Sequence, residues 1–264
     1  MIRRAFFLTL SLLPGFLAAQ EAAAAKPLRI LTYNIHHGEG MDKKLDLARV
    51  AAFIKKVDAD AVFLQEVDNK TKRTGGVDQA AELGKLAGLE VTFGKAMDFQ
   101  GGGYGNAILT KAKPAGSRVI PLPGGGEPRA ALVVEIADGH GISGDGKITL
   151  VCTHLDVSAP KARETHAKQL AEEFAKTPGT VICGGDMNCG PQDAPMKAFT
   201  APWMVPKKQG DKILTCPCPV PRNEIDFLMV KPSAGKELTV PRYEVIQELV
   251  ISDHLPVVME IRKK

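Results

Sequence analysis

The sequence has few aromatic residues and no recognisable disulfide pattern. Only 5% of its 264 residues are aromatic, and Trp occurs once. Few side chains are therefore available to stack on nucleobases, which disfavours a protein built around single-stranded nucleic acid. The five cysteines do not form the framework of a small disulfide-rich domain. Cys216 and Cys218, separated by one proline, lack the His or Cys partners of a zinc site.

An excess of charge of either sign is also missing. The formal charge of +4 includes Arg3 and Arg4, so the chain beyond its first residues is close to neutral. A nearly neutral chain lacks the extended basic surface on which proteins bind polyanions. Nucleic acid is therefore a less favoured partner than a compact ligand.

Residues 1–25 have the pattern of a secretory signal peptide. Arg3 and Arg4 precede the apolar residues 5–13, and small residues cluster at 18–25. This apolar run is too short for a spanning helix, which needs roughly 20 residues, although an uncleaved anchor is the alternative interpretation. No later run is long enough to cross a membrane. We expect a secreted or periplasmic protein with one domain at 26–264, and a monomer in solution.

Two periodicities predict a mixed α/β domain. Helical spacing of apolar residues occurs at 43–57, 77–87 and 167–174. Gly- and Pro-rich segments at 101–106, 114–128, 138–146 and 204–223 predict loops. The β-type runs are 28–33, 61–66, 107–111, 131–137, 147–153, 180–184, 225–230, 243–248 and 255–261. We expect two sheets packed face to face, with helices outside.

Polar residues gather at the ends of several of these runs. Asp186 and Asn188 follow the apolar run 180–183, and residues two apart share one face if the strand continues. Four further clusters end or flank apolar runs: Thr32-Tyr33-Asn34, Gln65-Glu66, Thr153-His154-Leu155-Asp156 and Ser252-Asp253-His254. Five such strand ends predict one shared cleft at an edge of the β-core.

The residue types in these clusters suit phosphoryl chemistry beside a hard cation. Mg²⁺ takes oxygen ligands and is typically held by one or two carboxylates plus substrate phosphate. The candidate oxygen ligands are Asn34, Glu66, Asp186, Asn188 and Asp253. His154 and His254 can hydrogen-bond a phosphate oxygen or protonate a leaving group near neutral pH. A carboxylate that orients a histidine is also expected, and Asp226 is the candidate.

Each of these residues has a structural interpretation as well. Asn34 could cap a turn, Glu66 could be an exposed strand-end acid, and single histidines are often structural. His36 and His37 we interpret as structural loop residues. Three further residues are candidates for substrate contact or for solvent-exposed and turn positions: Arg73, Tyr104 and Asn106.

The complete set of motifs resembles the endonuclease/exonuclease/phosphatase superfamily, which has the DNase-I-like fold. The motifs run in family order through most of 28–262. They are Thr32-Tyr33-Asn34-Ile35, Gln65-Glu66-Val67, Tyr104-Gly105-Asn106-Ala107, Thr153-His154-Leu155-Asp156, Gly185-Asp186-Met187-Asn188, Glu224-Ile225-Asp226-Phe227 and Ser252-Asp253-His254-Leu255-Pro256. The resemblance implies a four-layer α/β/β/α sandwich with two central mixed sheets. The segment 73–79 looks like that of small exported bacterial members.

The resemblance also implies roles for single residues. Glu66 would bind the metal, with Asn34 and Asp253 nearby, and Asp186 would orient or deprotonate the attacking water. The remaining catalytic roles fall to Asn188 and His154, which stabilise the phosphate, and to His254 paired with Asp226. Glu224, Met187 and Phe227 depart from the residues that the family often has at these positions, which affects substrate contacts rather than the reaction.

Together these observations predict a secreted, Mg²⁺- or Mn²⁺-dependent phosphohydrolase that cleaves a small-molecule or lipid-headgroup phosphoester or phosphodiester. A DNA or RNA nuclease is the alternative enzyme. A non-catalytic binding module on the same fold would be expected to lack at least one of the core polar groups, and none is missing.

Export predicts a shortened N-terminus. Cleavage should fall between Ala19 and Lys26, where small residues follow the apolar run. Mass spectrometry of the protein from its native host measures the N-terminus, and an intact Met1 on a cytosolic protein would overturn the localisation.

Overall fold

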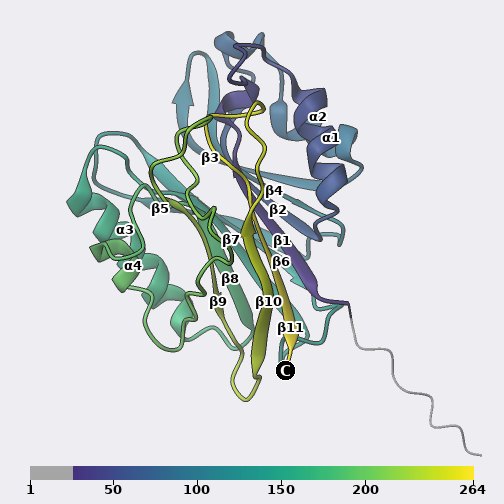
Figure 1. Cartoon of the computed structure of the whole chain (residues 1–264), viewed down its shortest axis with the longest axis vertical. Coiled ribbons are helices and arrows are strands. Elements are labelled where there is room, and N and C mark those ends of the chain that lie inside the picture. Colours follow the sequence, from purple (N-terminus) through teal and green to yellow (C-terminus); the bar gives the residue numbers. More distant parts are fainter. Residues whose placement is uncertain (1–25) are drawn as a thin grey trace, which may run out of the picture.

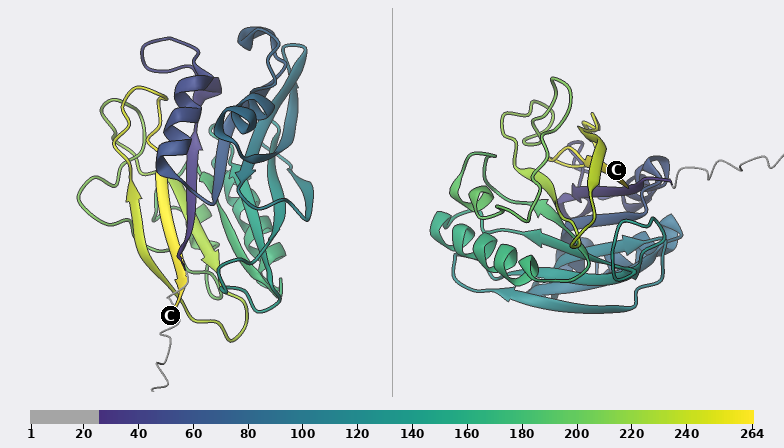
Figure 2. Two further views of the ribbon diagram at one scale, coloured as in Figure 1. Left: turned by 90° about the vertical axis from the view of Figure 1, so that its right-hand side faces the viewer. Right: turned by 90° about the horizontal axis from the view of Figure 1, so that it is seen from below.

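The structure, a computed structural model, describes residues 26–264, so the predicted signal peptide at 1–25 lies outside the described residues. Two β-sheets pack face to face, and helices cover the outer face of each (Figures 1 and 2). The predicted four-layer α/β/β/α sandwich with two central mixed sheets is confirmed.

The first sheet has six strands in the order β10-β11-β1-β2-β4-β3. β1 and β2 are parallel and are joined through helix α1 (Leu47–Val57), while the other neighbours are antiparallel. Its strands are β1 (Leu28–Asn34), β2 (Ala61–Asn69), β3 (Glu90–Phe99), β4 (Gly102–Thr110), β10 (Leu238–Val245) and β11 (Val257–Lys263).

The second sheet has five strands in the order β5-β6-β7-β8-β9. Its one parallel pair, β7 and β8, is joined through helix α3 (Pro160–Ala175). Its strands are β5 (Gly116–Leu122), β6 (Arg129–Ala137), β7 (Lys147–His154), β8 (Thr180–Asp186) and β9 (Asp226–Lys231). Each sheet therefore contains one parallel pair, and the carboxyl ends of its two strands meet at the same edge.

Alternation along the strands builds an apolar layer between the sheets. Ile30 of β1 and Phe63 of β2 share this layer with Leu150 of β7 and Ile182 of β8, and all four are fully buried. The intervening positions, such as Leu31, point to the opposite face of the sheet. Each sheet thus needs an apolar cover on its outer face as well.

The helices supply that cover from opposite flanks of the molecule (Figure 1). α1 and α2 (Gln79–Ala87) pack on the first sheet, and α3 and α4 (Ala194–Lys197) pack on the second. Within residues 26–264, no helix has both the length and the apolar character that crossing a bilayer requires.

Two strands, β3 and β5, are absent from the sequence prediction, and both lie at sheet edges. β5 is largely exposed and contains Pro121, which an edge strand tolerates because it pairs on one side only. The loops predicted at 101–106 and 114–128 are therefore partly wrong, since β4 and β5 occupy much of them. A Cβ at Gly105 of β4 would lie 2.0 Å from the carbonyl oxygen of Gly94, so this glycine permits close strand approach rather than a turn.

Candidate active site

The inner layer becomes polar at the end where both parallel pairs terminate. Every second residue of a strand faces inward. The inward series that contain Ile30, Leu150 and Ile182 end at Asn34, His154 and Asp186. In the strand register, Asn34 is opposite Gln65, His154 is opposite Asp186, and Asp186 is opposite Asp226. The predicted convergence of polar strand ends follows from this register.

Gln65 marks the boundary between the apolar core and this polar end. Its amide nitrogen donates to Thr32 Oγ1 at 3.2 Å and contacts Cys152 Sγ at 3.2 Å, and the side chain is fully buried. Gln65 is thus satisfied within the protein. Its role is structural, and Glu66 is the member of that pair that reaches the cleft.

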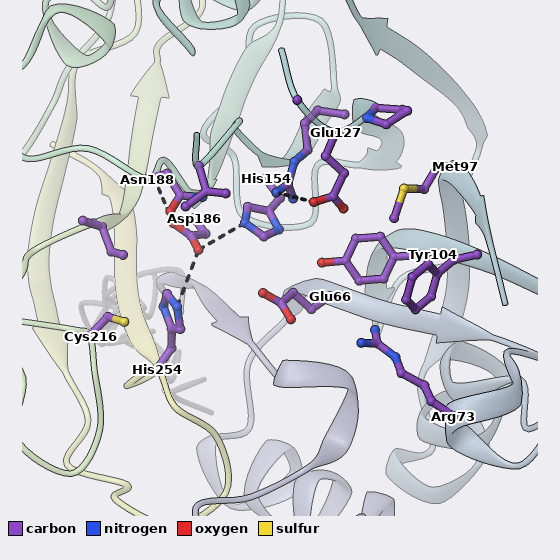
Figure 3. A pocket seen from close by; sticks show the side chains of 16 residues that line it. Glu66, Arg73, Met97, Tyr104, Glu127, His154, Asp186, Asn188, Cys216 and His254 are labelled. Atoms are coloured by element: carbon purple, nitrogen blue, oxygen red, sulfur yellow. Dashed lines mark hydrogen bonds and ion pairs between the residues drawn. The ribbon is translucent and has the colours of Figure 1, made fainter. Parts of the chain in front are cut away.

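A cleft of about 820 Å³ opens at this end of the sandwich. Figure 3 shows side chains from both sheets pointing into it, with Asp186, His154 and His254 on one side and Tyr104 and Arg73 on the other. Its lining consists of Glu66, Arg73, Met97, Phe99, Tyr104, Gly126, Glu127, Pro128, Arg129, His154, Val157, Asp186, Asn188, Cys216, Ile225 and His254. This volume suits a compact ligand.

One oxygen atom, Asp186 Oδ2, is the centre of the polar network. Asn34 Nδ2 donates to it at 3.1 Å, His154 Nε2 lies 3.3 Å away, and His254 Nε2 lies 3.6 Å away. The second oxygen, Oδ1, accepts the backbone N–H of Asn188 at 2.9 Å. Burial raises the pKa of Asp186 to about 7; the charge of Asp226 adds to this rise, and that of His254 opposes it.

His254 is held as a cation by two carboxylates. Its Nδ1 lies 2.9 Å from Asp226 Oδ2, and the other ring nitrogen faces Asp186. Burial alone would lower the pKa of His254, but Asp226 and Asp186 together raise this pKa well above its ordinary value. Ligand atoms of these three residues lie within 4.8 Å of one another, a spacing that could also hold a cation, but the Nδ1 contact already engages Asp226.

The pKa of His154 is shifted in the opposite direction, to below its ordinary value. Burial lowers the pKa of His154 well below its ordinary value, and the charges of Arg129 and His254 lower it further. A neutral imidazole forms no ion pair with Asp186 and has a single N–H to donate. The two histidines therefore offer one neutral and one charged donor around the same point.

Glu66 adopts a backbone conformation that few non-glycine residues use. Its φ is 58°, at an irregularity where the pairing of β2 with β4 shifts between Leu64 and Val67. A bulge redirects side chains, and strained backbone gathers at functional sites. Here it turns Glu66 into the cleft (Figure 3).

The surroundings of Glu66 fit a divalent cation. Its carboxylate accepts one hydrogen bond, from Asn34 Nδ2 at 3.1 Å, and no Lys or Arg pairs with it anywhere in residues 26–264. A partly exposed, unneutralised carboxylate is the oxygen ligand that Mg²⁺ or Mn²⁺ prefers. The Asn34 amide nitrogen donates to the carboxylates of Glu66 and Asp186, and its amide oxygen accepts the His36 N–H. The role of Asn34 as a metal ligand therefore stays a prediction.

Asn188 also lies in the left-handed region, with φ at 50°. Its side-chain amide donates to the carbonyl oxygen of Leu155 at 3.0 Å, which ties the end of β8 to the end of β7. The preceding Gly185 has no room for a Cβ, which would lie 1.9 Å from the Thr153 carbonyl oxygen. The local sequence Gly-Asp-Met-Asn is therefore required both by packing and by the site.

Arg73 and Tyr104, two predicted substrate contacts, form the far wall of the cleft. Asp68 fixes the Arg73 guanidinium through two hydrogen bonds, at 2.7 and 2.8 Å. The guanidinium carbon lies 4.7 Å from the ring centre of Phe99 and 5.6 Å from that of Tyr104. Burial and the charge of Glu66 raise the pKa of Tyr104, so its hydroxyl, which faces Glu66 in Figure 3, remains a donor.

Arg129 and Glu127 line the cleft, yet neither is among the residues predicted for the site. Arg129 is 5% exposed and pairs with Glu127 at 3.1 Å. Its Nε and Nη1 are buried and have no hydrogen-bond partner within residues 26–264. Buried polar groups are normally paired, so these atoms are free to receive an anionic ligand group. The feature of the sequence that could have identified Arg129 is its position at the start of an apolar strand run.

Four predicted residues do not line the cleft. Asn34 and Asp226 lie behind it and contact the lining residues Asp186 and His254. Asn106 is 2% exposed and donates to the carbonyl oxygen of Ala130 at 2.8 Å, which joins the two sheets. Asp253 lies next to His254 in the chain, and its Oδ1 accepts from Ser252 Oγ at 3.3 Å. The roles of Asn106 and Asp253 in substrate and metal binding stay predictions. All five cysteines are free thiols.

The arrangement agrees with comparisons to known proteins. A model of the Endonuclease/Exonuclease/phosphatase family matches residues 31–254. A search of curated proteins gave no match.

Several solved structures share the fold at low sequence identity. A Beutenbergia cavernae endonuclease/exonuclease/phosphatase is 21% identical, with a TM-score of 0.68 over 90% of this chain and 72% of that one. A Bacteroides thetaiotaomicron family protein is 18% identical, with a TM-score of 0.73 over 90% and 98%. D. rerio TDP2, complexed with a single strand DNA product, is 19% identical, with a TM-score of 0.71 over 89% and 99%. On the strength of the family match, this chain belongs to the endonuclease/exonuclease/phosphatase family.

Proposed function

We propose that this protein is an exported, Mg²⁺- or Mn²⁺-dependent hydrolase of a compact phosphoester or phosphodiester. Members of its family are metal-dependent phosphoester hydrolases. The observation that carries the proposal is the convergence of Asn34, His154 and His254 on Asp186 Oδ2, beside the unneutralised carboxylate of Glu66. Export rests on the sequence pattern of residues 1–25.

We infer a role for each group around the scissile phosphate. Asp186, as a carboxylate, accepts a proton from the attacking water, whose oxygen forms the new bond to phosphorus as the ester P–O bond breaks. The leaving oxygen keeps the electron pair of the broken bond and takes a proton to become the alcohol product. A pKa near 7 suits a general base at neutral pH. Charged His254 and neutral His154 donate to the phosphoryl oxygens, where charge develops.

Glu66, with Asn34 and Asp253 as further candidate ligands, would hold a divalent cation, which would supply positive charge beside the phosphate. Arg129 lines the same cleft as His154 and adds unpaired donor nitrogens there. Phosphoryl transfer depends mainly on positioning and charge neutralisation, and these groups supply both.

The cleft walls favour a small substrate over duplex DNA. Arg73 is already paired with Asp68, and the two unpaired nitrogens of Arg129 are assigned to the first phosphate, so little positive charge is left for a second phosphate. Tight duplex binding rests on many Lys and Arg contacts to phosphates. The Phe99 and Tyr104 wall offers apolar contact to a compact leaving group. A nuclease is the second candidate, favoured by the cleft-lining aromatic rings on which a base could stack.

The substrate class can be tested with the purified protein. After treatment with EDTA it should be inactive, and Mg²⁺ or Mn²⁺ should restore hydrolysis of bis(p-nitrophenyl) phosphate, p-nitrophenyl phosphate or glycerophosphodiesters, because the ligands are oxygens. The comparison is kcat/KM for this panel against cleavage of a single-stranded oligonucleotide and nicking of a plasmid at moderate salt. Efficient nicking with inert small esters would make the protein a nuclease.

Replacing the proposed base tests the mechanism. Asp186→Asn keeps the side-chain shape but removes the proton acceptor, so kcat should fall by about 10²-fold or more. Asp98→Asn, at an exposed carboxylate of the edge strand β3, is the matched control and should leave kcat unchanged. Circular dichroism verifies that both variants fold. A folded Asp186→Asn protein with undiminished turnover would reject this role.

The pH profile should respond to Asp226. Activity requires deprotonated Asp186 and protonated His254, so kcat/KM should rise through about pH 7 and fall at alkaline pH. The charge of Asp226 raises both pKa values. Asp226→Asn should therefore move both limbs to lower pH, the alkaline limb by about 1–3 units. Asp98→Asn again serves as control; limbs that stay in place in Asp226→Asn would contradict these assignments.

A further inference from the structure

The loop that follows β1 carries two histidines that the proposed mechanism does not use. His36 and His37 lie in the short 3₁₀ turn His36–Gly38, directly after Asn34 and Ile35. One ligand atom each from His36, His37 and Glu66 lies within 4.8 Å of the other two. All three residues are partly exposed. The sequence-based interpretation of these histidines as purely structural does not account for this spacing.

The backbone fixes the two imidazoles in place. His36 and His37 have φ values of 45° and 44°, in the left-handed region that residues with a Cβ seldom adopt. The fully buried Gln79 donates to the His37 carbonyl oxygen at 2.6 Å and accepts the Asp68 N–H at 2.9 Å. Asn34 Oδ1 accepts the His36 N–H at 3.1 Å. Such strain persists only where surrounding contacts enforce it, and it gathers at functional sites.

The hydrogen bonds also leave ring nitrogens available as ligands. His36 Nδ1 lies 3.3 Å from the Glu39 carbonyl oxygen, and a carbonyl only accepts, so Nδ1 carries the hydrogen and Nε2 keeps its lone pair. A backbone carbonyl in this position is the usual support of a metal-binding histidine. His37 Nδ1 is buried and has no hydrogen-bond partner within residues 26–264. A ligand would satisfy it.

The neighbouring charges permit a cation at this place. Arg73 and His36 are the positive groups that act on His37, and Asp68 holds the Arg73 guanidinium through two hydrogen bonds. Glu66 adds a carboxylate that forms no ion pair with a Lys or Arg of the described chain, although the charge of Arg73 reaches it, and Glu39 is a further nearby acid. The ligand set of two imidazoles and one carboxylate differs from an all-oxygen magnesium site, because imidazole selects borderline first-row cations such as Zn²⁺.

We propose that His36, His37 and Glu66 form a binding site for a divalent transition-metal cation of the Zn²⁺ and Co²⁺ class. The site shares Glu66 with the proposed catalytic centre, and to that extent it rests on the proposed function. Its affinity for such ions comes from the histidines, so it can be measured without any substrate.

Cobalt binding tests the site in the full chain. EDTA-treated protein is titrated with Co²⁺ and followed by visible absorption, for the wild type, His36→Asn, His37→Asn and the control His140→Asn. His140 is a partly buried histidine with a backbone carbonyl contact like that of His36, near Lys26 and Asp60 at the other end of the sheet. We expect each loop variant to lose at least about tenfold in Co²⁺ affinity, since even outer-shell partners contribute 10–100-fold. The control should match the wild type.

A second measurement needs no variant, in case a loop substitution prevents folding. Zn²⁺ should protect two histidines of the wild-type protein from modification by diethylpyrocarbonate, identified as His36 and His37 by peptide mass spectrometry. Equal Co²⁺ affinity in all folded variants, or no protection by Zn²⁺, would overturn the site.

Mg²⁺-dependent ester hydrolysis by the wild type, measured in parallel, separates the two proposals. Hydrolysis with histidine-independent Co²⁺ binding would reject only the transition-metal site. Histidine-dependent Co²⁺ binding without hydrolysis of any phosphoester would reject only the proposed function.

Discussion

Burial of the Asp186 carboxylate between the two sheets is the constraint on which the rest of the site depends. The residue is 1% exposed, and an isolated buried charge is costly unless it is paired and hydrogen-bonded. Asn34, from the other sheet, and the Asn188 N–H supply hydrogen bonds, while His254 supplies charge. The same contacts that stabilise the carboxylate bring donors from four chain segments to one point. The complete site therefore exists only when the two sheets are packed together.

Much of this could be predicted because strand periodicity is local information. The inward alternation that makes Ile182 a core residue also makes Asp186 an inward acid, and the same holds for Ile30 and Asn34. The edge strands β3 and β5 were not predicted, because an edge strand is half exposed and lacks the continuous apolar run of a central strand. Glycines in β4 resembled loop residues, although their function there is close strand approach.

The parts of the site that could not be predicted depend on contacts distant in sequence or on backbone strain. From the sequence, Arg129 is interpreted as a surface or packing residue. In the structure it is buried near His154, and two of its nitrogens have no partner within residues 26–264. Nothing in the sequence indicates that Glu66, His36, His37 and Asn188 all adopt positive φ. Glu66 lies where the pairing of β2 with β4 shifts, and the other three lie just beyond the ends of β1 and β8, so regular sheet pairing does not dictate their backbone conformation.

The two cleft histidines show how environment assigns chemistry to identical side chains. His254 faces two carboxylates and is held protonated, whereas His154 lies near Arg129 and His254 and is held neutral. Their pKa values move apart because the sheet order places Asp226 of β9 beside His254, next to Asp186 of β8. A phosphate in the cleft would then meet a charged donor and a neutral donor without any proton having to be redistributed first. Such preorganisation is what electrostatic catalysis of phosphoryl transfer requires.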